Sequence, residues 1–466
     1  MILWCIEKNN IYANIVLDMD SLAKRQNLRT VITLAIPAIV EEVLSTLLKY
    51  VDTAMVGQLG EEATASVSLT NSVNWLIGST FSAIGVAIVA LMSTSYGAGE
   101  HDRVRKISSQ VLLYSAVSGL VVGLLACGLS PKIPIWMQAD VSIQGMAARY
   151  FKIISIPMIF KALTRICASA LRAVKDTKIP MFINLAGNVL NVILNYLFIY
   201  TFGYGVIGAA IATMISCIFT GSLMLFVMLK HGMLCFSFNE MSLDKSILRQ
   251  SFSIGFPAFA TSFVSCMGHI VFASLVASMG TTVFAAHSIA LSAESLFYLP
   301  GYGLRSATTT LIGISVGEND IEKFRCVKNQ SVALTVAMMT FTGVCLFVCS
   351  PAIMGIFTPS LPVIQMGSGV LRLIAVSEPL YGIMIVSEGI YYGLGRTKRP
   401  FVVSTIGAWG IRIFFTVICV KLLKATLFEV WICMFADNSF RALALFIPLV
   451  SGKDKRFFED RRSMIV

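Results

Sequence analysis

Four polar residues at helical spacing interrupt an apolar stretch near the amino terminus and could do chemistry inside it. They are Glu42, Ser45, Lys49 and Asp52, in a run that begins near Thr30. At about 100° per residue they fall within an arc of about 80°, so a helix would carry them as one polar stripe. A carboxylate such as Asp52, set among apolar neighbours, can exchange a bound proton for a cation. The alternative is that Lys49, on the same face, neutralises Asp52 as a structural ion pair.

A row of asparagines marks a second apolar segment, FINLAGNVLNVILNYLF. Asn184, Asn188, Asn191 and Asn195 stand at i, i+4, i+7 and i+11 and share one helical face. Such amides can hydrogen-bond between membrane helices. Their carbonyl oxygens, placed beside one carboxylate, also suit a hard cation such as Na⁺. We therefore expect Asn188, Asn191 and Asn195 to form a proton or coupling-ion site with Asp52.

The second half of the chain offers its own candidates. His287, Glu294, Tyr298 and Arg305 share a face over about five helical turns, with Glu294 about 20 Å from the outer helix end and so near the bilayer midplane. Glu294 beside His287 could carry a proton or balance a cationic substrate, or it could simply pair with Arg305. Glu378, just before a proline, is a second candidate with the same structural alternative. Other intramembrane charges could pair in ways that the sequence leaves open: Glu41, Arg149, Lys152, Lys161, Arg165, Arg372, Arg412, Asp437 and Arg441.

Membrane-spanning helices are the elements that must position these residues. Hydrophobic residues make up 56% of the chain, charged residues only 13%, and mean hydropathy is +0.79, which indicates an integral membrane protein. A bilayer core of about 30 Å needs roughly 20 helical residues per crossing. The sequence predicts an all-α protein with twelve spans, at 30–57, 63–92, 106–130, 141–165, 180–201, 206–230, 249–279, 282–313, 326–350, 362–392, 400–421 and 426–449.

Lysine and arginine gather in alternate connections between these spans. Basic groups occur before residue 30 and around residues 105, 175, 245, 325, 398 and 456, whereas the other connections hold only Lys132, Lys421 and Lys424. Because short cytoplasmic loops retain positive charge, both termini are predicted to lie in the cytoplasm. The alternation accounts for the net charge of +11 and argues against nucleic-acid binding, which needs basic residues on one soluble face.

The second half of the chain matches the first at a single constant offset, without gaps. Pro37 falls on Pro257, Gly60 on Gly280 and Gly97 on Gly317. An even number of spans per half makes this a parallel repeat, with a central cavity expected between two six-helix lobes. The predicted organisation is an N-terminal arm at 1–29, a first lobe at 30–230, a linker at 231–248, a second lobe at 249–450 and a tail at 451–466.

Several other classes of protein are disfavoured. The start of the chain, MILWCIEKNNIYANIV, is too short in its apolar part for a cleavable signal. The 11 cysteines show no metal-ligand spacing, and the four histidines, at 101, 231, 269 and 287, are too scattered for an HExxH-type site, so no enzymatic activity and no cofactor are expected. A channel is also disfavoured, because it would need a symmetrically lined pore and no alternation between outward-open and inward-open states.

Several segments together resemble the multidrug and toxin extrusion (MATE) family of secondary transporters. These are VDTAMVGQLG, ALRAVKDTKIP, NVLNVILNYLFIY and GVIGAAIAT in the first half, and GTTVFAAHSIAL and GLGRTKRP in the second. The resemblance implies a V-shaped protein with twelve helices that exports organic, often cationic, compounds in exchange for Na⁺ or H⁺. It matches Asp52 to a carboxylate on the first helix, Pro37 to the proline at which that helix bends, and Thr213 to a hydroxyl near the same site.

Two departures from the family pattern concern charge. Asn195 stands where some members have an aspartate, which puts a two-carboxylate proton mechanism in doubt, and Ser265 aligns with a glutamate of another branch. In the tenth span Tyr381, rather than Glu378, could occupy the position of the family's acidic residue.

We expect a secondary active antiporter that exports cationic organic compounds in exchange for H⁺ or Na⁺ by rocker-type alternating access. Its partners would be a small organic molecule and the lipid bilayer, and it would act as a monomer in a bacterial inner membrane, which the short loops favour. The alternative is a flippase for a lipid-linked or amphipathic precursor, which would use a large cationic cavity lined by Lys49, Arg149, Lys161 and Arg165.

Overall fold

The computed structural model describes residues 2–235 and 243–451, with side chains from Arg25 onward, and these residues contain no strand. Their helical segments are α1 (Ile2–Gly57), α2 (Glu61–Gly97), α3 (His101–Leu129), α4 (Ile133–Trp136), α5 (Val141–Ser155), α6 (Met158–Ala173), α7 (Lys178–Asn195), η1 (Tyr196–Thr201), α8 (Gly205–Lys230), α9 (Lys245–Ala277), α10 (Thr281–Gly317), α11 (Ile321–Phe357), α12 (Leu361–Gly393), α13 (Lys398–Thr405), η3 (Ile406–Ile413), α14 (Phe414–Lys421) and α15 (Leu427–Val450). The short segments η1 and η3 are π-helical and continue α7 and α13.

The predicted all-α membrane architecture is confirmed. Among the described residues, eleven helices are long and apolar enough to cross a bilayer, and the bent pair α5–α6 makes a twelfth span. The fourth span, predicted at 141–165, is longer than predicted and bent. The chain bends by 52° between Ser155 and Met158, and α6 continues to Ala173. Pro157 lies in this break, where its missing N–H and its ring prevent an uninterrupted helix.

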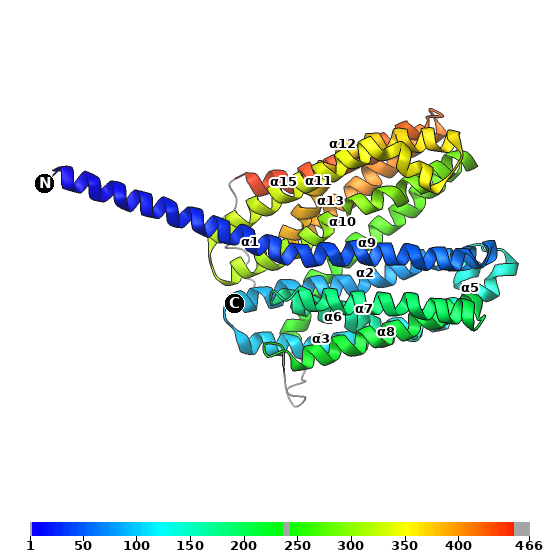
Figure 1. The fold of residues 1–466 in the computed structure, drawn as a ribbon, viewed down its shortest axis with the longest axis horizontal. Helices are drawn as coiled ribbons and strands as arrows, with labels where there is room; N and C mark the ends of the chain where they lie inside the picture. The colour runs from blue at the N-terminus through cyan, green and yellow to red at the C-terminus, as the bar shows by residue number, and fades with distance from the viewer. Residues whose placement is uncertain (1, 236–242, 452–466) are drawn as a thin grey trace.

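Helix α1 extends beyond the predicted first span. The span was expected from residue 30, and the apolar span is Arg25–Gly57. Helix α1 runs without a break from Ile2, so the predicted arm at 1–29 is helical and projects beyond the other helices (Figure 1). No proline or glycine precedes Pro37, so no residue type that breaks helices interrupts it. The predicted tail at 451–466 lies outside the described residues except for Ser451, and the predicted linker at 231–248 lies outside them at 236–242.

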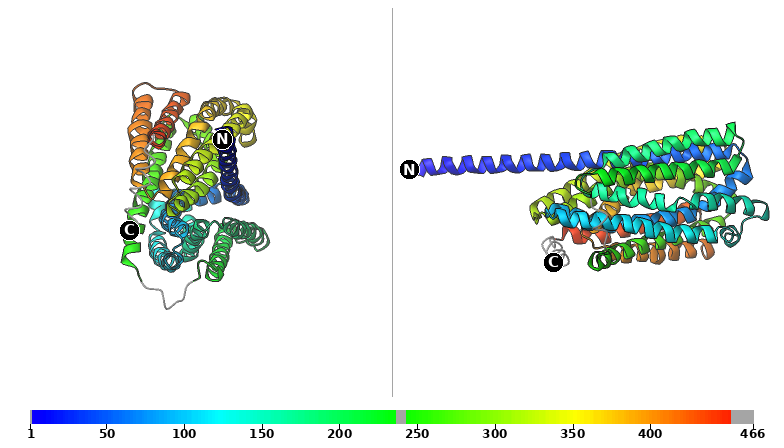
Figure 2. Two further views of the ribbon diagram at one scale, coloured as in Figure 1. Left: turned by 90° about the vertical axis from the view of Figure 1, so that its left-hand side faces the viewer. Right: turned by 90° about the horizontal axis from the view of Figure 1, so that it is seen from below.

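The helices form two groups that diverge from one end. Helices α1–α8 make the first lobe and α9–α15 the second, and the lobes separate toward the right of Figure 1. We call the end that holds the connection 174–177 and the end of α15 the terminal end, and the opposite end the distal end. Figure 2 shows the lobes from the terminal end as two neighbouring groups of helices.

Burial separates central helices from lipid-facing ones. In α2 and α12, 56% of the most apolar window is buried, against 22% in α7–η1 and in α11. Because the bilayer solvates apolar side chains as well as a protein interior does, α11 can expose residues such as Phe341 and Val348. Its exposed apolar surface therefore faces lipid, whereas α2 packs against α10 of the second lobe and α12 is enclosed by α10, α11 and α15.

Two helices cross between the lobes near their prolines. Before Pro37, Val31, Leu34 and Ala35 of α1 pack in a hydrophobic cluster of the second lobe. After it α1 lies along α7 of the first lobe, while Tyr50 still donates to the Ser292 carbonyl of α10 at 3.0 Å. Helix α9 does the reverse about its proline, Pro257: Ile247 and Ile254 pack in the first lobe and Phe272 in the second. The two prolines, which occupy equivalent positions in the repeat, stand where the chain crosses between lobes.

Candidate functional site

The polar stripe of α1 and the asparagine row of α7 face each other. Asn184 Nδ2 donates to Glu41 Oε1 at 2.7 Å, Asn188 Nδ2 donates to Ser45 Oγ at 3.0 Å, and the Asn195 amide donates to Asp52 Oδ1. Each pair is separated by 143 residues in sequence. Two parallel helices with the same 3.6-residue period keep one register over three turns, which is why successive pairs meet.

Asp52 sits at the distal end of this ladder. Its partner Asn195 is completely buried, and Asn195 Nδ2 also lies 3.3 Å from Asn191 Oδ1. Asn191 Nδ2 in turn donates to Thr213 Oγ1 of α8 at 3.4 Å. The predicted residues Asp52, Asn191, Asn195 and Thr213 therefore form one connected hydrogen-bond network, at the point where α7 passes into the π-helical η1.

One oxygen in this network is unused. Asn195 Oδ1 is buried and has no hydrogen-bond partner among the described residues. A buried amide oxygen without a partner loses its hydration and gains nothing in return. Beside a carboxylate, it is suited to ligate a small hard cation or to accept a hydrogen bond from a protonated acid.

The ladder forms one wall of a cavity of about 380 Å³ inside the first lobe. Helices α1, α2, α5, α6, α7 and α8 surround it, and Asp52, Asn188, Asn191 and Thr213 all line it. Its apolar walls include Phe81 and Ile154, and its volume lies within the range of about 300–1,000 Å³ typical of small-molecule sites. This polar cavity lies within the first lobe, and the central cavity expected between the lobes stays a prediction.

Lys49 does not neutralise Asp52. Across the described ion pairs none joins these two side chains, and the charges that act on Lys49 are those of Arg165 and Glu42. Asp52 instead receives the amide of Asn195. The side chain of Lys49 is exposed to the cavity, so both groups line the same cavity without an ion pair between them.

The candidates on α10 are buried rather than placed in the first-lobe cavity. His287 Nδ1 accepts a hydrogen bond from Trp431 Nε1 at 3.2 Å, and its ring meets Phe272 edge-on at 5.5 Å. These contacts make His287 a core residue held among aromatic rings. Glu294 is 6% exposed and does not pair with Arg305.

Glu378 of α12 is buried close to Glu294. Neither carboxylate oxygen of Glu378 has a hydrogen-bond partner in the described part of the chain, and Glu294 is the charged group that acts on it. Tyr298 stands beside this pair, with its ring 5.4 Å from that of Tyr381. Two carboxylates that share a buried site with phenols can share a proton or hold one cation.

Other intramembrane charges form ion pairs that the sequence left unassigned. Arg172 of α6 contacts Glu41 at 2.6 Å, and Arg305 of α10 contacts Glu388 of α12 at 3.1 Å. Asp437 of α15, fully buried, receives Arg412 at 2.8 Å and Arg441 at 2.5 Å. Partners on separate helices carry no spacing signal in the chain, whereas Asp437 and Arg441 stand at i and i+4 on α15, a spacing that the sequence does show.

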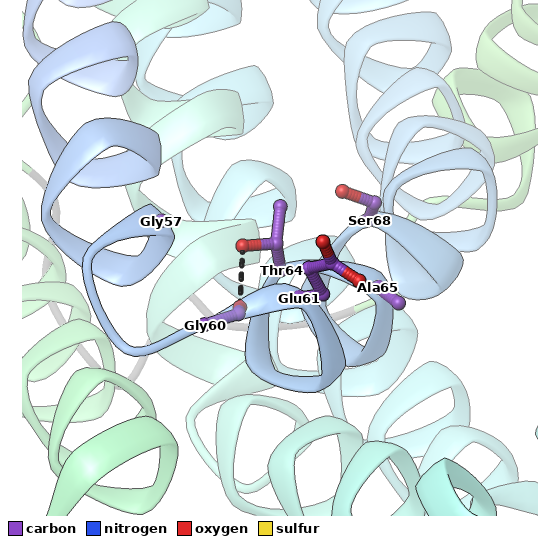
Figure 3. Close-up of a pocket in the computed structure, with 6 residues that line it drawn as sticks. All are labelled: Gly57, Gly60, Glu61, Thr64, Ala65 and Ser68. Atoms are coloured by element: carbon purple, nitrogen blue, oxygen red, sulfur yellow. Dashed lines mark hydrogen bonds between the residues drawn. The ribbon is translucent and has the colours of Figure 1, made fainter.

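A second hollow lies at the distal turn between α1 and α2 (Figure 3). Thr64 Oγ1 donates to the carbonyl of Gly60 at 3.0 Å, and Gly60 has φ of 108°, which favours glycine. Its repeat mate Gly280 has φ of 123° at the corresponding turn. Small residues and backbone line this hollow, and Glu61 is its one charged lining residue, so it offers little to recognise a ligand.

Comparison with known proteins identifies the family. The MatE family model matches residues 37–197 and 257–418, and the two matches begin at the equivalent prolines Pro37 and Pro257. The chain is 27% identical over 436 residues to a probable multidrug resistance protein NorM of Thermotoga maritima, covering 91% of this chain and 92% of the relative. It is 26% identical over 390 residues to the multidrug resistance protein NorM of Vibrio vulnificus, covering 81% and 84%.

Solved structures share the fold. A MATE protein in complex with MaL6 superposes with a TM-score of 0.88 at 20% identity, covering 94% of this chain and 97% of the other. A MATE transporter of the MOP superfamily in an outward-facing conformation also has a TM-score of 0.88, with coverage of 95% and 98%. With both halves matched and the two-lobe helical fold shared, this chain is a multi-pass membrane protein that belongs to the MatE family of multidrug and toxin extrusion transporters.

Proposed function

We propose that this chain is a secondary active antiporter that exports amphipathic organic compounds with a cationic group in exchange for H⁺ or Na⁺. The observation that carries the proposal is Asp52, a carboxylate that lines an intramembrane cavity and, among the described residues, is bound by Asn195 but by no lysine. An intramembrane carboxylate costs about 2.5–3.5 kcal/mol on insertion scales, so it is a candidate functional group by default.

Antiport follows from competition for one negative charge. With Asp52 ionised, its carboxylate attracts the cationic group of a substrate. A proton or a Na⁺ ion at Asp52, with the free oxygen of Asn195 as a further ligand for Na⁺, removes that attraction. Because the two occupants oppose each other, entry of the ion from outside favours release of the substrate to the outside.

The shape change is assigned to α1. Its segment before Pro37 is packed against the second lobe and its segment after Pro37 carries Asp52 along the first lobe. A change in the Asp52–Asn195 contact therefore acts on a helix that spans both lobes, with Pro37 as the hinge. Glu294 and Glu378 are proposed as a second proton or cation site in the other lobe.

The topology follows the distribution of basic residues. With both termini cytoplasmic, the terminal end faces the cytoplasm and the divergent distal end faces outward, in a bacterial inner membrane. Each lobe contains its own core clusters, so the chain is proposed to act as a monomer.

The test replaces Asp52 with asparagine, which keeps the size of the side chain and removes its charge. In proteoliposomes with H⁺ and Na⁺ gradients imposed one at a time, we expect Asp52→Asn to reduce ion-driven efflux to the rate of empty vesicles. Glu62→Gln, at an exposed carboxylate ten residues along, is the matched control. Unchanged efflux in the folded Asp52→Asn protein would reject the coupling role.

A flippase is the second candidate function, because basic side chains line the same cavity. Lys49, Lys161 and Arg165 all line it, although Arg149, also predicted there, is exposed outside it. Transbilayer movement of a fluorescent phospholipid in protein-containing vesicles, measured by dithionite quenching without any ion gradient, would favour the flippase over the antiporter.

A further inference from the structure

Three basic side chains share the wall of the first-lobe cavity. Lys49 comes from α1, whereas Lys161 and Arg165 come from α6 at i and i+4, which places them on one helical face. Lys49 and Arg165 are exposed to the cavity and Lys161 is half-buried. Arg165 lies within electrostatic range of both lysines, so the three charges form one cluster.

No carboxylate contacts the bases of this cluster, unlike several other bases within the helical lobes. Arg172, Arg305 and Arg441 each contact a carboxylate at 3.1 Å or less. For Lys49, Lys161 and Arg165, the described residues place no carboxylate oxygen within 4.0 Å of the side-chain nitrogens. Like charges gathered in a partly dry site repel each other, and an anion that enters relieves that repulsion.

The net charge of the cavity also favours the binding of an anion. Its acidic lining residues are Glu41, Glu42 and Asp52, but Glu41 is already neutralised by Arg172 and bonded by Asn184. Three bases then face two acids. Asp52 is bound at the asparagine row and Glu42 acts on Lys49, so the cavity keeps an excess of one positive charge on the side of Lys161 and Arg165.

Neutral groups around the cluster suit an organic acid. Thr164 of α6 donates to Thr220 of α8 at 3.4 Å, and both hydroxyls line the cavity. Phe81 and Tyr150 add aromatic surface. A flat organic body against these rings, with its acid group at the cluster, would use both features.

We propose that Lys49, Lys161 and Arg165 form an anion-binding subsite, and that the substrates are zwitterionic organic compounds whose carboxylate binds there while their basic group binds Asp52. This deepens the proposed function and rests on it only for the role of Asp52. Binding at the cluster selects the substrate, and competition at Asp52 couples its export to the ion.

A matched pair of dyes tests the subsite by binding alone. Rhodamine 110 is a zwitterion with a free carboxylate, and rhodamine 123 is its cationic methyl ester. Fluorescence anisotropy with the purified full-length protein should show about tenfold tighter binding of rhodamine 110, the change expected for one charge-assisted contact. The double variant Lys161→Gln/Arg165→Gln should bind both dyes equally, and Arg149→Gln, which changes an exposed arginine outside the cavity, should retain the preference.

Cys217 supplies a second readout that needs no substrate. Its thiol lines the cavity within electrostatic range of Lys161 and Arg165. A variant that keeps only Cys217 is labelled with the anionic thiol reagent 2-sulfonatoethyl methanethiosulfonate and with its trimethylammonium counterpart. The ratio of the anionic to the cationic labelling rate should be several-fold higher than the same ratio for free cysteine in solution. The double variant should lose this gain, and a variant that keeps only the exposed Cys235 should never show it.

The outcomes separate this proposal from the antiporter. If wild-type protein binds the two dyes equally, and the variant that keeps only Cys217 reacts with both thiol reagents without charge preference, the anion subsite is overturned even if efflux occurs. If the preferences appear but Asp52→Asn leaves transport unchanged, the subsite stands and the coupling role fails. Stronger displacement of rhodamine 110 by dihexanoyl phosphatidic acid than by an equal concentration of a small carboxylic zwitterion would assign the subsite to lipid phosphate and overturn the carboxylate assignment.

Discussion

The close crossing of α2 and α10 allows the cost of opening the terminal end, the closed side of the transporter, to be predicted. A Cβ atom on Gly97 would lie 2.2 Å from the carbonyl oxygen of Ile314, and one on Gly317 would lie 2.0 Å from that of Thr94. The two contacts are related by the internal repeat, so each lobe contributes the same glycine and the same carbonyl position. Because both obstacles are backbone atoms, no side-chain rotation can relieve them.

The cost of filling this crossing can be worked from those distances. Real Cβ contacts lie at 3.0 Å or more, so the helices must separate locally by 0.8 Å at Gly97 (3.0 − 2.2) and 1.0 Å at Gly317 (3.0 − 2.0). Overpacking typically costs about 1–3 kcal/mol per site. The two sites share one crossing and are coupled, so we expect about 3 kcal/mol for the double variant, which would shift the equilibrium away from the closed terminal end by more than about a hundredfold.

Spin labels can measure this shift. With labels at Arg105→Cys and Arg325→Cys, on α3 and α11 near the terminal end, in a background without other cysteines, Gly97→Ala/Gly317→Ala should move the double electron–electron resonance distance distribution to longer values. Gly355→Ala, where a Cβ would meet nothing within 4 Å, should leave the distribution unchanged. An unchanged distribution in a double variant that keeps wild-type thermal stability would refute the idea that this crossing holds the terminal end closed.

Three further perturbations have defined outcomes. Pro257→Ala should lower the turnover number for efflux without weakening dye binding, because it stiffens α9 where that helix crosses between lobes; equal loss of both would argue for a packing defect instead. Asp437→Asn should lower stability by about 3–5 kcal/mol, seen as a clear fall in the midpoint of thermal unfolding, because Arg412 and Arg441 would remain buried without a counter-charge. Asp140 caps α5 by accepting a hydrogen bond from the backbone N–H two residues on, which holds the pKa of Asp140 below its ordinary value of 3.8. The cap therefore contributes fully above about pH 4 and is lost as pH falls further, so Asp140→Ala should speed hydrogen exchange in the first turn of α5 at neutral pH and make no difference at pH 2.

Part of the site was predictable because a single helix carries its own geometry. The 3.6-residue period alone placed Ser45, Lys49 and Asp52 on one face, and all three line the cavity. The same period aligned the asparagines of α7, which meet α1 at three successive positions. The identities between the two halves of the chain predicted the paired lobes and the paired prolines.

Other features of the site depend on how helices pack. The sequence left Lys49 either paired with Asp52 or free of it. A spacing of three residues on a helix places two side chains near each other but does not fix the direction in which either one points. It likewise left Glu294 free to pair with Arg305, whereas Arg305 turns to Glu388 on α12. The flippase alternative grouped Lys49, Lys161 and Arg165 with Arg149 in one cavity, and only the structure separates the three that line it from Arg149, which is exposed outside it.

By itself, the sequence determined the membrane location, the number of spans, the repeat and the polar face of each helix, because hydropathy, length and period are local properties of the chain. Only the tertiary structure decided the bend at Pro157, the exchange of partners at the two prolines and the choice of counter-charge for each buried group. The physical reason is that a buried charge is stabilised by whichever opposite charge the packing brings within about 4 Å, and that distance is set by the register and tilt of neighbouring helices rather than by any pattern within one of them.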